Sequence, residues 1–523
     1  MIVDGRSVSA GSKLAADICI IGAGAAGITL ARGLTDSKLS VLLLESGGFD
    51  PEASSQDFAR GESVGQRYIP LESARLRCFG GSTMHWGGWC RPLEPVDFEQ
   101  RAWVPYSGWP ITRTTLDPYY PLAQEFCQLG EFAYDPADWD LPNGALLSLP
   151  ADRWHSRIIQ FSPPTRFGIR YRDQIARATT LTVYLHSTAL RLTASGNGRR
   201  ILGLKVATLA GNSFEVTAKS YVLAAGGIDN PRLLLASNDV LPAGIGNDHD
   251  LVGRFFADHI QLDTAGLFPV DRRMNLDLYQ PSSREIARHS RHAGARSANL
   301  MAYLTLDRQV QQSRHVLNYS ANVLATSWSD YFITQKSTGG VAEQSYWQEF
   351  VGSLRRLWGN LDAAVEQTPA SDAPIFKIVT TQEQAPNPAS RVRLASERDA
   401  LGMPRPALDW RLSELDRQTI EVAVDELAKA FGAAGSARIH APLELQTRGW
   451  PQHIPISWHH CCTTRMSDDP KNGVVDANGR VHGVDNLYVA GSSVFSTSGN
   501  GNPTLSIVAL ALRLADRLKE VLR

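Results

Sequence analysis

Apolar residues near the N-terminus change from one periodicity to another. The segment DICIIGAG, residues 17 to 24, is a short apolar run that stops at glycines, and AAGITLARGLTD continues with helical spacing. The next segment, KLSVLLLESGG, is a second continuous apolar run and reaches Glu45. Short continuous runs are typical of buried strands, and a spacing of three to four is typical of a helix. Residues 17 to 45 are therefore predicted to form one strand, helix and strand unit.

Further elements follow the same patterns. Strands are predicted between residues 181 and 237 in LTVYLHSTALRLTA, ILGLKVATL and FEVTAKSYVLAAGG, the last of which leads into the helical NPRLLLAS. Residues 261 to 450 hold alternating runs and an amphipathic helix, LDRQTIEVAVDELAKAFGAAG. Near the C-terminus, NLYVAG predicts a strand and NPTLSIVALALRLADRL a largely buried helix. Residues 98 to 180 are rich in Trp, Pro and Tyr, and their pattern predicts no clear elements.

Length and composition limit the class of protein. A chain of 523 residues exceeds what one core usually supports, so two interleaved domains are expected. The 52 basic and 53 acidic residues nearly cancel, which leaves no global field for nucleic acid or an anionic membrane. No apolar run reaches the ~18 residues of a membrane span, and the N-terminus lacks a secretory signal. We therefore expect a cytoplasmic protein, and six cysteines in so long a chain predict no disulfide framework.

GAGAAG supplies a dinucleotide fingerprint. Gly22, Gly24 and Gly27 have the G-x-G-x-x-G spacing, after a predicted strand and at the start of a helix. Such glycines allow a tight turn, close approach of a pyrophosphate and helix packing. Glu45, at the end of the second strand, is placed to accept hydrogen bonds from ribose hydroxyls and would repel a 2′-phosphate. The chain contains no second such motif, which favours FAD over NAD because a single cofactor must carry out the redox chemistry itself.

Two other segments carry candidate chemistry. RLRCFGGSTMHWGGWCRP, residues 75 to 92, holds two glycine pairs that permit close backbone approach to a flat ligand. SWHHCCTTRM, residues 457 to 466, holds adjacent histidines and adjacent cysteines. A metal site there is disfavoured because neighbouring residues of an extended strand point to opposite faces, so the cysteines are interpreted as buried packing residues. In NPTLSIVALALRLADRL, Asn502 is expected to cap a helix and Pro503 to be its first residue.

Several of these motifs together resemble the glucose-methanol-choline (GMC) oxidoreductases, in particular the branch of pyranose oxidase, gluconate dehydrogenase and fructose dehydrogenase. The resemblance rests on GAGAAG with Glu45, GGSTMHWGGWC, YVLAAGGIDNPRLLL, DLVGRFFADH, HHCCTTRM and the C-terminal NLYVAGSSVFSTSGNGNPTLSIVALALRLADRL. It implies an α/β fold with a Rossmann-like FAD-binding domain of the p-hydroxybenzoate hydroxylase type and an interleaved substrate domain of sheet and helices. We assign residues 1–97, 181–260 and 451–523 to the first domain, and residues 98–180 and 261–450 to the second.

The resemblance also implies site residues. The family's catalytic histidine lies in an H-x-x-G-T pattern, which matches His459 with Cys462 in place of the usual glycine; its partner matches Asn502, and His460 is assigned to support or substrate contact. His85 lies where some relatives carry a covalent link to flavin, and a plain polar contact is the alternative. The residues implied to bind FAD are Gly22, Gly24, Ala25, Ala26, Gly27, Glu45, Ser46, Gly80, Gly81, Ser82, His85, Trp86, Gly87, Gly88, Ala189, Ala225, Gly226, Asn230, Gly491, Ser492, Asn502, Pro503 and Thr504. No metal is expected.

Alternation in IVTTQEQAPNP, residues 378 to 388, gives one more candidate. It places Thr380, Gln382 and Gln384 on one strand face, with Thr381 and Glu383 on the other. We select Gln384 as a substrate residue, and an exposed polar strand is the alternative.

These features predict an FAD-dependent oxidoreductase that converts a CH-OH group of a sugar, glycoside or aminosugar to a carbonyl. Neutral His459 takes the hydroxyl proton while a hydride leaves for flavin N5, and Asn502 donates to the same oxygen. The electron acceptor is oxygen, a quinone or a redox protein, and an oligomer is compatible with the sequence. Three alternatives stay open: the large subunit of a membrane-associated dehydrogenase that feeds a cytochrome, a lyase with a silent flavin, and a flavoprotein without catalysis.

Overall fold

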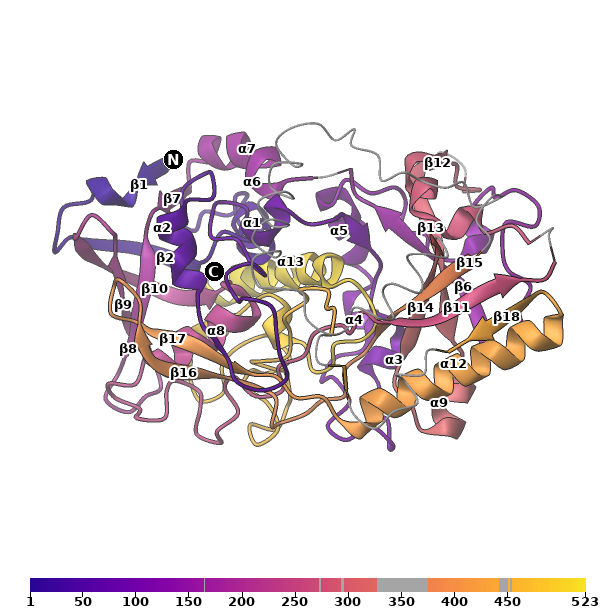
Figure 1. Ribbon diagram of the computed structural model, residues 1–523. Helices are drawn as coiled ribbons and strands as arrows, with labels where there is room; N and C mark the ends of the chain where they lie inside the picture. The colour runs from indigo at the N-terminus through magenta and orange to yellow at the C-terminus, as the bar shows by residue number, and fades with distance from the viewer. Residues whose placement is uncertain (164, 272–273, 293–295, 327–374, 442–449, 452–453) are drawn as a thin grey trace.

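The computed structural model describes residues 1–163, 165–271, 274–292, 296–326, 375–441, 450–451 and 454–523 (Figure 1). Its first large sheet has the strand order β1-β7-β3-β2-β10-β9-β8, and β19 also pairs with β10. The strands of this sheet are β1 (Ile2–Asp4), β2 (Lys13–Ile21), β3 (Val41–Leu44), β7 (Leu181–Leu185), β8 (Thr188–Ala194), β9 (Ile201–Ala207), β10 (Ser213–Leu223) and β19 (Leu487–Val489).

The predicted strand, helix and strand unit is confirmed at the centre of this sheet. β2 pairs in parallel with β3 and with β10, and all four residues of β3 are buried, as its continuous apolar run indicates. Helix α1 (Ala25–Gly33) connects β2 and β3 and packs on the C-terminal helix α13 (Pro503–Val521). A Cβ atom at Gly33 would lie 3.0 Å from the Cβ of Ala515, so a small residue there lets the two helices approach closely.

The second large sheet is antiparallel and has the order β18-β11-β15-β14-β13-β6-β5, with β12 paired to β13. Its strands are β5 (Trp89–Cys90), β6 (Trp154–Phe161), β11 (Asp263–Pro269), β12 (Ala287–Arg288), β13 (Ala298–Leu306), β14 (Tyr319–Thr326), β15 (Ile375–Gln382) and β18 (Ala437–His440). The predicted amphipathic helix is α12 (Glu414–Ala434), which contacts β18, β11 and β14 of this sheet (Figure 1). It starts at a capping box of Ser413 and Asp416 and stops at Gly435, whose φ is 64°.

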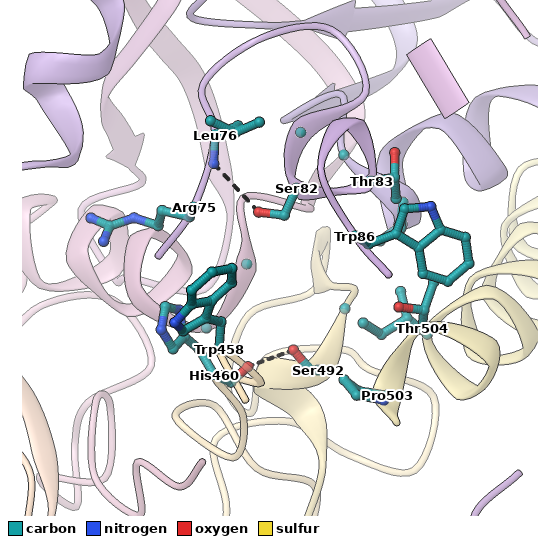
Figure 2. A pocket seen from close by; sticks show the side chains of 18 of the residues that line it. Arg75, Leu76, Ser82, Thr83, Trp86, Trp458, His460, Ser492, Pro503 and Thr504 are labelled. Carbon is teal, nitrogen blue, oxygen red and sulfur yellow. Dashed lines mark hydrogen bonds between the residues drawn. The ribbon is translucent and has the colours of Figure 1, made fainter. Parts of the chain in front are cut away.

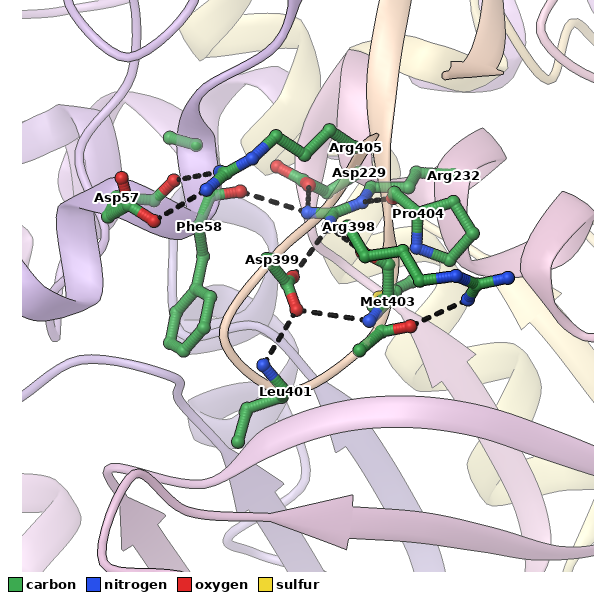
Figure 3. A network of polar contacts seen from close by, with 12 residues as sticks. Asp57, Phe58, Asp229, Arg232, Arg398, Asp399, Leu401, Met403, Pro404 and Arg405 are labelled. Carbon is green, nitrogen blue, oxygen red and sulfur yellow. Dashed lines mark hydrogen bonds and ion pairs between the residues drawn. The ribbon is translucent and has the colours of Figure 1, made fainter. Parts of the chain in front are cut away.

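A third sheet of three strands, β4 (Glu62–Ser63), β16 (Arg391–Arg398) and β17 (Pro404–Asp409), is tied to helix α8 (Gly226–Ala236) by a buried polar network (Figure 3). Arg232 of α8 donates to the Asp399 carboxylate at 2.7 Å and to the carbonyls of Phe58 and Pro404. Asp399 also accepts from the backbone N–H of Met403. The network therefore holds the turn between β16 and β17, and with it Met403, against α8.

The remaining helices of the described residues are short. They are α2 (Ala53–Gln56), α3 (Pro95–Phe98), α4 (Arg113–Leu116), α5 (Tyr120–Phe126), α6 (Phe167–Arg170), α7 (Arg172–Arg177) and α9 (Arg308–Arg314). Single 3-10 turns occupy Gly5–Ser7, Asp57–Ala59, Gly81–Met84, Pro136–Asp138, Asp277–Tyr279, Pro281–Glu285 and Ser492–Val494. Residues 98–180 thus form several short helices and β6, which explains why their pattern has no single period. Within the described chain, we find no helix with the length and apolarity that a membrane crossing needs.

The predicted α/β class is confirmed, and the buried apolar side chains form two large clusters. One cluster surrounds the first sheet, α1 and α13, and the other surrounds the second sheet and α12. Every strand of the first sheet comes from the ranges that we assign to the FAD-binding domain, whereas β5, from the same ranges, belongs to the second sheet. The division into two interleaved domains stays a prediction from the sequence.

Candidate active site

A cavity of about 570 Å³ is lined by residues of both large sheets (Figure 2). The first sheet contributes the residues that follow the carboxyl ends of β2, β3 and β10, where open parallel sheets bind their ligands. The start of α13 and residues 456–460 also reach the cavity, and the second sheet contributes single side chains from β5, β6, β14 and β15.

The glycine-rich turn after β2 brings backbone to the cavity. Gly22 has a φ of +105°, a conformation that side chains rarely adopt, and a Cβ atom at Gly27 would lie 1.9 Å from the carbonyl oxygen of Gly22. A Cβ atom at Gly24, in contrast, would have no protein atom within 4 Å. Gly22 and Gly27 are therefore required by the turn itself, whereas Gly24 leaves space at the N-terminus of α1, where an anion is stabilised.

Glu45 is fixed at the end of β3. Its carboxylate accepts from the backbone N–H of Ala23 and from that of Gly47, each at 3.0 Å. Burial raises the pKa of Glu45, and these hydrogen bonds oppose that change. A carboxylate can accept more than two hydrogen bonds, so Glu45 keeps acceptor capacity for hydroxyl groups in the cavity.

The second glycine-rich segment forms another part of the cavity wall. The Ser82 hydroxyl accepts from the backbone N–H of Leu76 at 3.4 Å, which closes the loop that Figure 2 shows, and Trp86 donates to the carbonyl of Thr165 at 2.9 Å. The His85 ring stacks on that of Trp458, with 5.7 Å between the ring centroids. Burial, together with nearby Arg166, lowers the pKa of His85 to about 4, so this imidazole is neutral at physiological pH.

A pair of histidines lies beside the cavity. Nδ1 of His459 lies 2.8 Å from Nδ1 of His259, and Nε2 of His259 lies 3.3 Å from the carbonyl oxygen of Ser498. Because a carbonyl only accepts, His259 carries its proton on Nε2 and accepts through Nδ1. His459 must then donate through Nδ1, which leaves the lone pair on its Nε2. Burial, reinforced by His259, His460 and Arg91, holds the pKa of His459 well below its usual value and keeps the ring neutral.

Asp258 holds the backbone of both histidines by hydrogen bonds. It is fully buried and accepts through one oxygen from the backbone N–H groups of His259 and His459, at 2.7 and 2.8 Å. Its other oxygen accepts from the Tyr68 hydroxyl. Burial raises the pKa of Asp258 to about 6. Sequence reasoning assigned no role to Asp258 or His259, although DLVGRFFADH ends on these two residues.

His460 has different surroundings from His459. Its ring lies 5.8 Å from that of Tyr68 and 5.6 Å from that of Phe256, and its carbonyl accepts from the Ser492 hydroxyl at 2.6 Å (Figure 2). Burial and Arg75 lower the pKa of His460 to about 3. Cys462 has a φ of 70°, so it adopts the left-handed conformation that the family's glycine would adopt without strain.

Known proteins match the chain along most of its length. Residues 386–511 match the family model described as GMC oxidoreductase, and residues 17–243 match the one described as FAD dependent oxidoreductase. The chain is 25% identical to the fructose dehydrogenase large subunit of Gluconobacter japonicus, over 97% of this chain and 98% of that protein. It is also 25% identical to the 6'''-hydroxyparomomycin C oxidase of Streptomyces lividus, over 95% and 90%. Residues 386–511 are therefore similar to the GMC oxidoreductases, in agreement with the resemblance that the motifs predict.

Solved structures give the same fold. Pyridoxine 4-oxidase from Mesorbium loti, at 20% identity, has a TM-score of 0.59 over 96% of this chain and 98% of its own. The cofactor of this protein is FAD, in agreement with the second family model. The cavity fits that cofactor: the turn after β2 leaves space for a pyrophosphate, and Glu45 offers a carboxylate to a ribose. The segment from His85 to Gly88 also lines the cavity, as do Asn502 and Pro503.

Most of the residues that we predict to bind FAD line the cavity. Three do not: Gly27 packs on the turn at Gly22, Gly80 forms a backbone turn with a φ of +108°, and Asn230 is fully buried. Asn230 accepts from the backbone N–H of Ala225 and donates to the carbonyl of Ala490 and to the Ser493 hydroxyl. These three residues therefore hold the residues of the cavity wall in place but do not line the cavity themselves.

Asn502 and His459 both line the cavity, as does His460. Pro503 is the first residue of α13, as predicted, but the Asn502 side chain makes no capping bond to that helix. The Asn502 amide is therefore not used to cap this helix. All six cysteines are buried and free, and within the described ranges no group of three or more His, Cys, Asp or Glu side chains could hold a metal ion.

The structure does not place Gln384 at the cavity. Strand β15 ends at Gln382, and Gln384 lies outside the cavity wall. Its carbonyl oxygen accepts from the backbone N–H of Asp258 and from the Trp410 indole at 3.1 and 3.0 Å, and its amide donates to the carbonyl of Arg411. A fully buried amide had to find protein partners. Thr381, on the face that we did not select, lines the cavity instead.

Proposed function

We propose that this protein is a GMC oxidoreductase that oxidises a CH-OH group of a sugar, glycoside or aminosugar to a carbonyl, with His459 as the base. The observation that supports this most is the pair of His459 and His259, because their hydrogen bonds leave a lone pair on Nε2 of a neutral imidazole beside the cavity. Imidazole is the side chain whose ordinary pKa suits proton transfer near neutral pH.

The reaction needs three contributions from the chain. FAD, when bound, supplies the hydride acceptor. His459 takes the hydroxyl proton at Nε2, while His259 and Asp258 hold its ring and backbone. The Asn502 amide donates to the same oxygen and orients the carbon that loses the hydride. Helix α13 starts at Pro503 in the cavity wall. Its N-terminus stabilises negative charge that develops in the cavity during the reaction.

The substrate class is supported by the relatives and by the wall. The relatives carry the names fructose dehydrogenase and 6'''-hydroxyparomomycin C oxidase, and another is paromamine 6'-oxidase at 26% identity. Asn322, Thr381 and Gln261 bring polar groups to the cavity from the substrate side. Side chains of these types are suited to the hydroxyl groups of a carbohydrate.

Anaerobic mixing tests the proposal. The purified holoenzyme is mixed with a panel of sugars, glycosides and aminosugars, and loss of the flavin absorbance near 450 nm is followed. Reduction by at least one alcohol, with recovery of the matching carbonyl product, supports the proposal; a flavin that no alcohol reduces contradicts it and favours a silent flavin. Admission of air then separates an oxidase, which re-oxidises fast, from a dehydrogenase, which needs a quinone or a redox protein.

A second candidate is the large subunit of a membrane-associated dehydrogenase. It is favoured by the match to a fructose dehydrogenase large subunit over nearly the full length of both proteins. Slow re-oxidation by air, together with fast electron transfer to a cytochrome c, would support this candidate. A cytoplasmic location stays a prediction from the sequence.

We also propose that His85 is placed for a bond to the flavin. It lines the cavity and is neutral, so it can act as a nucleophile. Denaturation in acid checks this: a yellow colour that stays with the protein indicates a covalent link, and a colour that is released indicates a polar contact alone.

A further inference from the structure

One face of the second sheet is turned toward the cavity. Side chains of opposite residues in neighbouring strands lie on the same face, and along a strand every second residue does. Ser320 lies opposite Thr381, and Asn322 lies two positions beyond Ser320. Asn322 of β14 and Thr381 of β15 both line the cavity. They form the polar half of this face.

The other half of the same face is apolar. Ile159 of β6 lies opposite Met301 of β13, and Trp89 of β5 lies opposite Phe161. These side chains pack together with Tyr303 in a small cluster that is separate from the two large cores. Trp89 and Ile159 reach the cavity. The cavity therefore meets a wall with an apolar half and a polar half.

One polar atom of the Asn322 side chain has no partner among the described residues. Its side chain is 8% exposed, and its Oδ1 atom is buried without a hydrogen-bond partner in the described part of the chain. Buried polar atoms are nearly always satisfied, so an unsatisfied acceptor in a cavity wall indicates a donor that arrives with a ligand. The neighbouring strand residue Ser320 is satisfied, because it donates to the carbonyl of Thr381 at 2.7 Å.

Arg91 provides hydrogen-bond donors in the same cavity wall as Asn322. One of its nitrogens donates to the Ser320 hydroxyl at 3.0 Å and to the carbonyl of Asn500, and its guanidinium carbon lies 4.2 Å from the centre of the Tyr303 ring. Its Nε and Nη1 atoms are buried and have no partner among the residues that the structure describes. The wall thus combines unsatisfied donors with an unsatisfied acceptor. A hydroxyl group can serve both, since it donates and accepts.

We propose that Asn322, Thr381 and Arg91 form a subsite for the hydroxyl groups of a polyhydroxylated ring, a sugar or a cyclitol, whose apolar face packs on Trp89 and Ile159. The subsite rests on the proposed function, because it holds the substrate that His459 deprotonates. It selects ring alcohols with several hydroxyls over alcohols with one, since the latter leave the wall unsatisfied.

Two neighbouring threonines of β15 offer a matched test. Thr381 lines the cavity, whereas Thr380 is fully buried and belongs to the opposite face of the strand. Anaerobic flavin reduction is measured for the parent, Thr381→Val, Thr380→Val and Asn322→Ala. The probes are methyl glucosides, glucosamine and myo-inositol, with cyclohexanol as a ring of the same size with one hydroxyl.

We expect Asn322→Ala and Thr381→Val to raise the substrate concentration for half-maximal reduction by the best polyol about 10- to 100-fold. The same variants should change reduction by cyclohexanol less than about twofold, and Thr380→Val should leave both unchanged. Flavin content of each variant is the check on folding, and Thr381→Val serves if Asn322→Ala does not fold. Equal effects on polyol and cyclohexanol would overturn the subsite.

The subsite and the proposed function fail in different ways. If cyclohexanol reduces the parent and every polyol is inert, alcohol oxidation stands and the subsite is wrong. If no alcohol reduces the flavin, the proposed function fails, and the subsite is judged from binding alone, as protection of the parent against thermal unfolding by the same polyols. Protection that Asn322→Ala abolishes supports the subsite, and the absence of protection contradicts it.

Discussion

The two walls of the cavity are built in different ways. The wall from the first sheet consists of turns whose backbone faces the ligand, such as the one at Gly22 and Gly24. The wall from the second sheet presents single side chains, such as Asn322 and Thr381, from antiparallel strands. A cofactor shared by many relatives can be held by backbone, because backbone geometry depends on few residue types. A particular substrate requires individual side chains, which a sheet can exchange without a change of fold.

The largest expected effect on the rate constant of flavin reduction is that of removing the proposed base, His459. His459→Ala should lower the rate constant of flavin reduction about 10²- to 10⁴-fold, because the proton acceptor is lost. His460→Ala, the neighbouring position, should lower it less than about tenfold, since His460 lies among Tyr68 and Phe256 and has no link to His259. Stopped-flow absorbance measures both. If His459→Ala reduces its flavin as fast as the parent, the assigned base is wrong.

Gly24 and Gly27, in the turn after β2, allow an effect on FAD binding to be distinguished from an effect on folding. Gly24→Ala should fold normally, because its Cβ atom meets no protein atom within 4 Å, but it should bind FAD at least about tenfold more weakly because it narrows the approach to the pyrophosphate. Gly27→Ala places a Cβ atom 1.9 Å from the Gly22 carbonyl and should destabilise the fold itself. FAD titration and thermal unfolding of the two variants distinguish the effects. Equal thermal stability of the two variants would contradict this division of roles.

The difference between a wall of backbone turns and a wall of single side chains also explains which features the sequence could predict. The βαβ unit, Glu45 and the start of α13 at Pro503 follow from local patterns, and the GMC resemblance added His459 and Asn502. Sequence reasoning missed His259, because its role depends on a contact with His459, 200 positions away along the chain. It chose Gln384 over Thr381 because alternation identifies two faces of a strand but does not say which of them meets the cavity.

The pH dependence of flavin reduction tests the surroundings of His459. Burial, His259, His460 and Arg91 hold the pKa of His459 well below 6.5, its usual value. The groups that face this ring are these three, with Asp258 on its backbone. The rate constant should therefore stay level from about pH 8 to 6.5, since the base remains unprotonated, and fall only at lower pH.

Arg91→Met should move this acidic limb to higher pH, because loss of a positive charge favours the protonated ring. Arg91→Lys keeps the charge and is the control, which should leave the limb near its position in the parent. Stopped-flow reduction between pH 4 and 9 measures all three proteins. A limb that does not move in Arg91→Met would show that the Arg91 charge does not act on His459.

The smallest effect concerns the backbone next to the base. Cys461 and Cys462 are both buried, but only Cys462 has a left-handed φ, 70°. A branched side chain is poorly tolerated there, so Cys462→Val should lower the free energy of unfolding by about 1–2 kcal/mol more than Cys461→Val does. Both variants replace the thiol by two methyl groups in a packed site. Cys461→Val also loses the bond from its thiol to the carbonyl of Ala257, so the difference between the variants is a lower limit of the backbone strain. Urea unfolding of the two holoenzymes measures it, and equal losses would mean that the turn beside His459 tolerates a branched residue.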